Sequence, residues 1–469
     1  MAGAIVFYIS GHGLGHATRS IEVINAILAK RPETRIGVRT SAPRWLFDLS
    51  VKGKVSFSAL ETDTGVVQID ALNLDEADSI RRAWAFHGDL VTRAASETRA
   101  LRELGAGLIV GDIPPLAFAA GAAAGIPSVA LGNFTWDWIY GDYPRVRLAP
   151  SLLPTIRAAY AKASFALRLP MSSGFDEAFS SVRDIPFIAR HATVPREVVC
   201  RKLRLPADKP IVLGSFGGYG LPGFDVTPLT KLRKYSVVMA APVQATRGRQ
   251  NPPLVQKQGS CFTVNVEALY DAGIRYEDLV GAAAVVVTKP GYGIVSECIA
   301  NNAAVLYTSR GHFPEYEVLV EEMQQYTAAA FIGQDDLFAG KWEPHLNKLL
   351  AAAKPAQTAD TSGADAAAEI LLKTLDKPPK KPRGRPRAKK AAGAEAATAA
   401  PASAPVVAPP VAAVKAVPKA AAPKPAVPKA AARKAPAART APTPRAVVKK
   451  AAPARKAVRP GARKAARKR

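Results

Sequence analysis

Short runs of apolar and β-branched residues alternate with helix-like apolar patterns through most of this chain, and this alternation constrains its fold more than any other feature. Parallel strands need a long connection between them, which a helix supplies, so the alternation predicts repeated strand–helix–strand units around parallel sheets. The first series has candidate strands at 4–9, 35–39, 108–111 and 128–131. It predicts one α/β domain, which we place at residues 1–170.

A second alternation of the same kind follows a Pro-punctuated segment of mixed charge at residues 171–208. We interpret that segment as an interdomain connection, because its prolines interrupt helical and strand patterns alike. The second alternation ends with a helix-like pattern at 363–375 and predicts another α/β domain at residues 209–376. A chain of 469 residues is long enough to bury two such cores. Its candidate strands are 211–218, 236–240, 262–264, 283–288 and 303–308.

Nearly all of the positive charge lies in the last part of the sequence. Residues 377–469 contain 26 of the 64 Lys and Arg residues and a single acidic residue, Glu395, and therefore +25 of the formal charge of +26. This part is rich in Ala, Pro, Lys and Arg and has no aromatic residue, so it cannot bury enough apolar surface to offset the entropy of ordering. We expect a disordered basic tail after a body, residues 1–376, that is close to neutral.

The start of this tail resembles a known DNA-binding motif. The stretch Pro-Arg-Gly-Arg-Pro, in which Arg383 and Arg385 flank Gly384, looks like an AT-hook, whose arginines enter the narrow minor groove of A·T-rich DNA. The rest of the tail resembles the Lys/Ala/Pro-rich tails of linker histones. Its charge should attract any polyanion, with an affinity that falls as salt rises. DNA, an acidic envelope polymer and the ribosome surface all remain candidate partners.

The sequence gives no sign of export or of membrane insertion. Cys200, Cys261 and Cys298 are odd in number and widely spaced, which favours a reducing compartment over a disulfide scaffold. The first ten residues lack the basic segment of a signal peptide. The uncharged stretch at 113–132 is interrupted by prolines and glycines, so it is better explained as strand, helix and strand than as a membrane span. We therefore expect a cytoplasmic protein without a transmembrane segment.

Two histidines stand in a glycine-rich stretch directly after the first candidate strand. Gly13 and Gly15 allow the backbone to approach a ligand closely, and the following helix offers unpaired N–H groups at its start. A neutral imidazole, from His12 or His16, can take a proton from an attacking hydroxyl. The alternative is a turn in which the histidines make only local hydrogen bonds. His16 occupies the position of the third glycine in a dinucleotide-binding fingerprint, which argues against a nicotinamide enzyme.

A general base needs a partner that orients it, and Asp112 stands at the carboxyl end of another candidate strand of the same domain. Because parallel strands end at the same edge of a sheet, Asp112 could reach His16, although a role as turn or cap residue is an equal alternative. Nearby, Asn133, Trp136 and Asp137 combine an aromatic ring with polar groups, as sugar-binding sites do. We take these three as candidate acceptor contacts, with core packing as the alternative for the aromatic rings.

The second domain repeats the pattern of a strand followed by glycines. The more informative stretch ends a strand at Thr288, continues through a glycine-rich turn and starts a helix near Tyr292. The start of such a helix can hold a diphosphate, and Ser296 and Glu297 come early enough to reach a ribose or a phosphate. Together with the loop before His16, this arrangement predicts a cleft with one glycine-rich wall from each domain.

Four motifs occur in the same order as in a known family: SGHGLGHATRSIEV, GDIPPLAFAAGAAAGIPSVALGNFTWDWIYGDY, SFGGYG and KPGYGIVSECIANNAAVLYTSRGHFPEYEVL. They resemble the N-terminal, glycosyltransferase-like region of plant L-arabinokinases and, more distantly, the peptidoglycan N-acetylglucosaminyltransferases and other nucleotide-sugar transferases of the GT-B fold. The resemblance covers roughly residues 4–350. The sugar-kinase half of the arabinokinases has no counterpart, so kinase activity is not expected.

This resemblance implies two Rossmann-like domains that face a cleft, with the acceptor on the N-terminal domain, the nucleotide sugar on the C-terminal domain and a final helix that crosses back. It implies that His16 acts as base with Asp112 as its partner, and that Gly13 and Gly15 belong to the acceptor side. Glu297 would hold the ribose hydroxyls and Glu315 the donor sugar. The candidate donor-binding residues are Gly217, Gly218, Lys289, Gly291, Tyr292, Gly293, Ser296, Glu297 and Glu315.

The leading hypothesis is therefore a metal-independent, inverting hexosyltransferase that needs no cofactor beyond its nucleotide-diphosphate sugar co-substrate. The same fold also serves a sugar 2-epimerase and relatives that only bind. The alternative is thus a non-catalytic sensor or scaffold that binds a nucleotide sugar and acts on DNA through its basic tail.

Overall fold

The computed structural model of this chain describes residues 3–217, 220–221, 223–241, 253–353, 355 and 357–377. Gly218 and the three tail residues Arg383, Gly384 and Arg385 lie outside the described residues.

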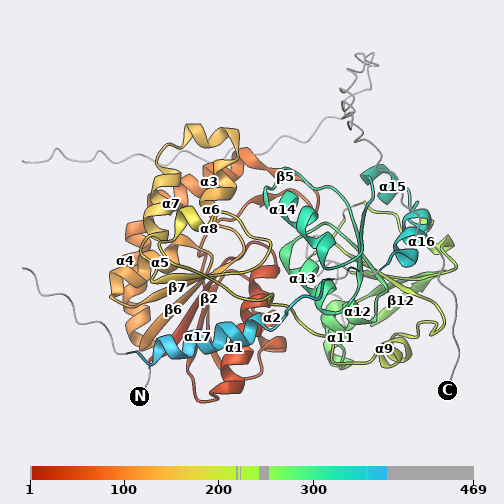
Figure 1. The fold of residues 1–469 in the computed structure, drawn as a ribbon, viewed down its shortest axis with the longest axis horizontal. Coiled ribbons are helices and arrows are strands. Elements are labelled where there is room, and N and C mark those ends of the chain that lie inside the picture. The colour runs from red at the N-terminus through yellow and green to blue at the C-terminus, as the bar shows by residue number, and fades with distance from the viewer. Residues whose placement is uncertain are drawn as a thin grey trace, which may run out of the picture. The chain divides into compact units, whose positions relative to one another are not determined.

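A seven-stranded parallel sheet forms the first domain (Figure 1). Its spatial order is β3-β2-β1-β6-β7-β8-β9, so the chain reverses its direction of travel across the sheet between β1 and β6. Ligands of open parallel sheets bind at such a reversal, outside the carboxyl ends of the strands. The strands are β1 (Ala4–Ile9), β2 (Ile36–Thr40), β3 (Val55–Ala59), β6 (Ala106–Asp112), β7 (Ser128–Gly132), β8 (Phe165–Arg168) and β9 (Val182–Asp184).

The second domain has its own seven-stranded sheet, with the order β12-β13-β11-β10-β14-β15-β16. Only the pair β12–β13 is antiparallel among the described strands of this sheet. Its reversal point lies between β10 and β14, the strands that carry the glycine-rich loops. The strands are β10 (Ile211–Ser215), β11 (Ser236–Ala240), β12 (Val255–Gln258), β13 (Cys261–Val264), β14 (Val285–Thr288), β15 (Ala304–Tyr307) and β16 (Ala329–Phe331).

Helices cover the sheets, and a short antiparallel pair, β4 (Val67–Gln68) and β5 (Leu74–Asp75), lies outside them. The first-domain helices are α1 (Gly15–Lys30), α2 (Arg44–Ser50), α3 (Glu76–Gly88), α4 (Leu90–Glu103), α5 (Pro115–Ala124), α6 (Trp136–Gly141), α7 (Leu152–Tyr160) and α8 (Phe175–Ala178). The later helices are α9 (Arg196–Leu203), α11 (Val266–Asp271), α12 (Tyr276–Ala282), α13 (Tyr292–Ala300), α14 (Glu315–Glu322), α15 (Gln334–Phe338), α16 (Glu343–Ala351) and α17 (Gly363–Leu375).

Strand β1 shows why the apolar runs become parallel strands. All six of its residues are buried, as expected where helices cover both faces of a parallel sheet. Ile5, Phe7 and Ile9 belong to the core that includes α1, whereas Val6 and Tyr8 belong to the core on the opposite face. This double packing fixes the end of β1, and with it the loop that carries the two histidines.

Two segments pack outside the domain bounds that the sequence suggested. Residues 171–208, expected as a connection, contribute strand β9 to the edge of the first sheet. Helix α17, assigned by sequence to the second domain, packs along α1 of the first, and Arg31 forms a two-pronged ion pair with Asp376 just beyond α17 (Figure 1). The three residues of β9 are too few to give a periodic signal that identifies its neighbour. The return of α17 to the first domain is the final crossing helix that the resemblance implied.

Candidate functional site

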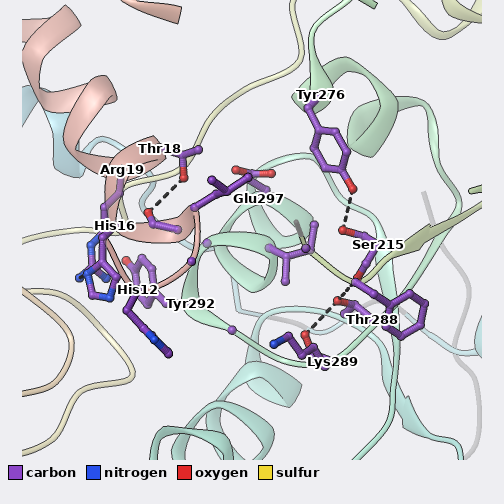
Figure 2. A pocket seen from close by; sticks show the side chains of 18 of the residues that line it. His12, His16, Thr18, Arg19, Ser215, Tyr276, Thr288, Lys289, Tyr292 and Glu297 are labelled. Carbon is purple, nitrogen blue, oxygen red and sulfur yellow. Dashed lines mark hydrogen bonds between the residues drawn. The ribbon is translucent and has the colours of Figure 1, made fainter. Parts of the chain in front are cut away.

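A cavity of about 250 Å³ is lined by residues of both domains. The starts of α1 and α13 meet at this cavity, where a Cβ atom placed on Gly293 would lie only 3.4 Å from the Cα of Gly15. Figure 2 shows His12, His16 and Arg19 on one side and Ser215, Thr288 and Lys289 on the other. The two glycine-rich walls predicted from the sequence therefore lie face to face.

His16 and Asp112 are in direct contact. His16 Nδ1 lies 2.8 Å from Asp112 Oδ1, and both side chains are buried. The contact follows from the sheet, because β1 and β6 are neighbours and Ile9 is in register with Asp112. His16 belongs to the first turn of α1, which starts from the same edge of the sheet. His16 also lines the cavity, although only 7% of its side chain is exposed.

Arg19 and Ser20 complete the surroundings of Asp112. Arg19 Nε donates to Asp112 Oδ2 at 2.7 Å, Arg19 Nη2 lies 2.5 Å from Oδ1, and the Ser20 hydroxyl donates to Oδ2 at 2.9 Å. Burial by itself raises the pKa of Asp112, but Arg19 and then His16 outweigh it and lower that pKa to about 2. Asp112 is therefore a carboxylate at neutral pH. Sequence reasoning missed Arg19, although its i, i+3 spacing from His16 on α1 places both on one helix face.

His12 lines the same cavity but is arranged differently. The backbone N–H of Val66 donates to His12 Nδ1 at 3.3 Å, so Nδ1 is an acceptor and Nε2 carries the hydrogen. Its ring stacks on Phe313 and stands edge-on to Trp136. Burial, followed by the charge of His16, lowers the pKa of His12 well below its ordinary value. His12 therefore stays neutral and shapes the wall of the cavity.

Asp63 is a buried carboxyl group that sequence reasoning missed. It accepts hydrogen bonds from the Ser10 hydroxyl at 2.9 Å and from the indole N–H of Trp136 at 2.8 Å. Burial raises the pKa of Asp63 to about 6. Trp136 is itself fully buried, and its indole N–H is used by Asp63, so the structure places this candidate acceptor residue in the core.

The structure does not bring Asp137 or Ser296 to the cavity wall. Asp137 is buried and accepts a hydrogen bond from Arg157 Nε at 2.8 Å. The Ser296 hydroxyl donates to the carbonyl of Gly293 within α13. Ser296 precedes the cavity residue Glu297, but the rotation of about 100° per residue in a helix turns its side chain away. No residue of α6, the helix that carries Asp137, lines the cavity.

The start of α13 and two cations form the second-domain wall. Gly291, Tyr292 and Gly293 line the cavity together with Lys289 and Arg310. Arg310 Nη1 donates to the Pro290 carbonyl at 3.3 Å, and its guanidinium lies over the ring of Phe313. Neither cation has a carboxylate within 4.0 Å among the described residues. Burial, followed by the charge of Arg310, lowers the pKa of Lys289 to about 7.

Glu297 lines the cavity one helical turn further along α13. Arg190 Nε donates to Glu297 Oε1 at 2.7 Å, and Arg190 Nη1 forms a second ion pair with Glu277 at 3.0 Å. Burial raises the pKa of Glu297, while Arg190 acts in the opposite direction. Arg190 comes from the segment that the sequence suggested to be a mere connection.

Glu315 and Asn133 join the two domains. Glu315, the first residue of α14, lines the cavity and accepts a hydrogen bond from Asn133 Nδ2 at 2.7 Å. Asn133 Oδ1 accepts from Arg19 Nη1, also at 2.7 Å. Gly13, Gly15 and Gly217 also line the cavity, whereas Asn133 does not.

Within the described part of the chain, no helix is long and apolar enough to cross a membrane. The same residues contain no group of three or more His, Cys, Asp or Glu side chains that could hold a metal ion.

Two parallel-sheet α/β domains of this kind have the GT-B fold of glycosyltransferases, as expected from the sequence. Among solved structures, a UDP-glucosyltransferase from Polygonum tinctorium capable of glucosylating indoxyl aligns with a TM-score of 0.50 and 13% identity, covering 81% of this chain and 99% of that chain. MurG from Acinetobacter baumannii aligns with a TM-score of 0.43 and 12% identity, covering 79% of this chain and 99% of that chain.

In sequence, the chain is similar to the L-arabinokinase of Arabidopsis thaliana, with 28% identity over 377 residues. The match covers 78% of this chain and 34% of the relative, so the chain spans about a third of the length of the curated protein that it matches. No family model matches the chain. The similarity to L-arabinokinase that the four motifs indicated is confirmed.

Proposed function

We propose that this protein transfers a hexosyl group from a nucleotide-diphosphate sugar to an acceptor hydroxyl, with inversion at the anomeric carbon. One observation carries the proposal: His16, which Asp112 contacts from behind the cavity wall, and the glycine-rich start of α13 line one cavity between the two domains. The fold of the UDP-glucosyltransferase that aligns with this chain supports a nucleotide sugar as the donor.

In the proposed reaction His16 is the general base. Its Nδ1–H donates to the Asp112 carboxylate, which leaves the lone pair of Nε2 for the proton of the acceptor hydroxyl. As that O–H bond breaks, the oxygen forms a bond to the anomeric carbon of the donor. The bond from this carbon to the diphosphate breaks at the same time, and its electron pair leaves with the diphosphate oxygen.

The second-domain wall receives the charge of the leaving diphosphate. The unpaired N–H groups at the start of α13 would donate to an anion bound there, and Arg310 supplies a positive charge. Lys289 supplies a second charge when protonated, a state that a bound diphosphate would favour. No described carboxylate lies within 4.0 Å of either side chain. These fixed cations can fill the role that a divalent cation plays in other transferases. We therefore propose a metal-independent reaction, for which activity in EDTA is the direct check.

The other residues that line the cavity are assigned to the donor on the second-domain wall and to the acceptor on the first-domain wall. Glu297, held by Arg190, would bind the ribose hydroxyls, and Glu315 would bind the donor sugar. Gly217 would lie beside the diphosphate, while Gly13 and Gly15 would face the acceptor. We also propose a cytoplasmic location. We further propose that the basic tail binds DNA or another polyanion, a proposal that rests only on the charge of the tail and on Arg383, Gly384 and Arg385.

The test starts with a thermal-shift screen of the full chain against nucleotide sugars, because a ligand that binds the native state raises its stability. With the donor so found, His16→Ala should keep the thermal shift and lose turnover by about 10² to 10⁴-fold, the usual contribution of a general base. His345→Ala on α16, outside the cavity, is the control. Unchanged turnover in His16→Ala would contradict the mechanism, and the anomeric configuration of the product tests inversion.

A further inference from the structure

Hydrogen bonds run without a break from α14 of the second domain to the imidazole of His16. Glu315 accepts from Asn133 Nδ2, and Asn133 Oδ1 accepts from Arg19 Nη1. All three side chains are buried. A carboxylate can only accept and a guanidinium can only donate, so the two neighbours together fix the orientation of the Asn133 amide. Asn133 is thus an oriented link between the two domains.

Arg19 extends this link to the catalytic pair. Its Nη2 lies 2.5 Å from Asp112 Oδ1 and 2.9 Å from His16 Nδ1. If Nδ1 carries a hydrogen, it donates to Asp112, and Nε2 then presents a lone pair to the cavity. If Nδ1 carries none, it accepts from Arg19, and Nε2 then presents an N–H. Only the first arrangement can take a proton from a substrate.

We propose that Asn133 is a positioning residue that selects the first arrangement. By accepting from Nη1 it holds the guanidinium so that Nε and Nη2 both stay on the Asp112 carboxylate. Without this acceptor, the guanidinium turns toward His16 and donates to Nδ1. Because Glu315 anchors Asn133 from the second domain, the state of the base depends on the seating of one domain on the other.

This inference rests on the proposed function in one respect only, namely that His16 Nε2 takes the proton of the acceptor hydroxyl. The tautomer itself belongs to the protein without substrate, so it is measured independently of any activity. The ¹⁵N chemical shifts of Nδ1 and Nε2 distinguish the two tautomers in histidine-labelled full-length protein. The chain has six histidines, and the His16→Ala spectrum assigns the signals of His16.

Two substitutions of similar size test the contacts of Asn133. Asn133→Leu removes both hydrogen bonds. Asn133→Asp keeps an acceptor for Arg19, and one proton shared between the two carboxyl groups replaces the amide N–H toward Glu315. At a pH where the imidazole is neutral, the wild type and Asn133→Asp should show hydrogen on Nδ1, and Asn133→Leu should show it on Nε2. The proposal is overturned if the wild type has its hydrogen on Nε2, or if Asn133→Leu keeps the wild-type tautomer. Should Asn133→Leu fail to fold, Asn133→Ala removes the same two hydrogen bonds with a smaller side chain, and the same two outcomes decide the proposal.

A kinetic measurement adds a second readout. Asn133 does not line the cavity, so Asn133→Leu should lower kcat by roughly 100-fold, as for a misplaced catalytic group, with the KM for the donor unchanged. Asn133→Asp should restore most of kcat. An equal loss of kcat in both variants would overturn the proposal that an acceptor at position 133 keeps Arg19 on Asp112 and so sets the tautomer of His16. A wild type that transfers no sugar would instead refute the proposed function, while the tautomer measurement would still decide the role of Asn133.

Discussion

Asp112 Oδ1 lies 2.8 Å from His16 Nδ1, although the two residues are 96 positions apart in the chain. Their contact is a property of the sheet: neighbouring parallel strands end at one edge, and a glycine-rich loop brings the first turn of α1 back over that edge. Arg19, one turn further along α1, binds both oxygens of the same carboxylate. Asp112 therefore orients the imidazole and anchors the start of α1 at once.

Asp112→Asn should impair both roles. An asparagine leaves the buried Arg19 guanidinium without its counter-charge, and removing one partner of a buried ion pair costs about 3 to 5 kcal/mol of the free energy of unfolding. It also offers an amide N–H where His16 needs an acceptor, so kcat should fall by roughly 100-fold. Urea unfolding and steady-state kinetics measure the two effects, with the exposed Asp208→Asn as the control.

The pH dependence of stability provides a check with a defined sign. The pKa of Asp112 falls from its ordinary value of 3.8 to about 2 in the folded protein. Its contribution to stability is therefore fully present above pH 3.8 and is lost as the pH falls through 2. Asp112→Asn should lack this loss, so the stabilities of wild type and variant should converge in acid. If the difference in the free energy of unfolding between wild type and Asp112→Asn stays constant down to the lowest pH, the low pKa of Asp112 is contradicted.

Lys289 should make donor binding depend on pH. Its pKa is lowered to about 7 in the free protein because it is buried and lies near Arg310. Above pH 7 the amine is largely neutral, and a bound diphosphate would raise its pKa again, so binding should take up a proton and weaken as the pH rises. Calorimetry in buffers of different ionisation enthalpy at pH 8 measures this uptake. Lys289→Met should abolish it, whereas Lys341→Met, an exposed residue away from the cavity, should not.

Much of the fold follows from periodicity alone. The apolar runs at 4–9 and 236–240 coincide with β1 and β11, and the predicted helix start at Tyr292 is that of α13. The rule that parallel strands end at one edge was enough to place Asp112 near His16. Local pattern and sheet geometry are therefore enough to predict the position of a residue that stands at the end of a strand.

The rest of the site depends on packing between distant segments. Arg190 reaches Glu297 from a segment without regular pattern, and Asp63 meets Trp136 from a loop after β3. Neither contact leaves a periodic signal in the sequence. Ser296 shows the opposite error: its early position in a helix suggested a ligand contact, but its side chain points back to its own helix.

The basic tail should be separable from the two α/β domains in its effect on the proposed activity. Deleting residues 378–469, which removes most of the positive charge, should leave donor binding and turnover unchanged and abolish binding to duplex DNA. In the full chain, Arg383→Ala with Arg385→Ala should remove a preference for A·T-rich DNA, as the AT-hook-like motif predicts. Lys389→Ala with Lys390→Ala removes the same charge and should weaken binding to all duplexes alike. Filter binding across a salt series measures both, and equal effects of the two pairs would argue against an AT-hook.

Gly291 and Gly333 offer a matched test of the proposed diphosphate site. Each is the residue before a helix, α13 and α15 respectively, and a Cβ atom on either would meet no atom within 4 Å. Alanine should therefore be tolerated at both positions, with melting temperatures close to that of the wild type.

Gly291 lines the cavity, so a methyl group there would stand between the start of α13 and an approaching phosphate. Gly291→Ala should weaken the binding of the donor by at least tenfold, about 1.4 kcal/mol, and Gly333→Ala should not change it. Equal affinities of the two variants in calorimetry would show that the diphosphate does not approach the backbone at Gly291, and would remove the start of α13 from the donor site.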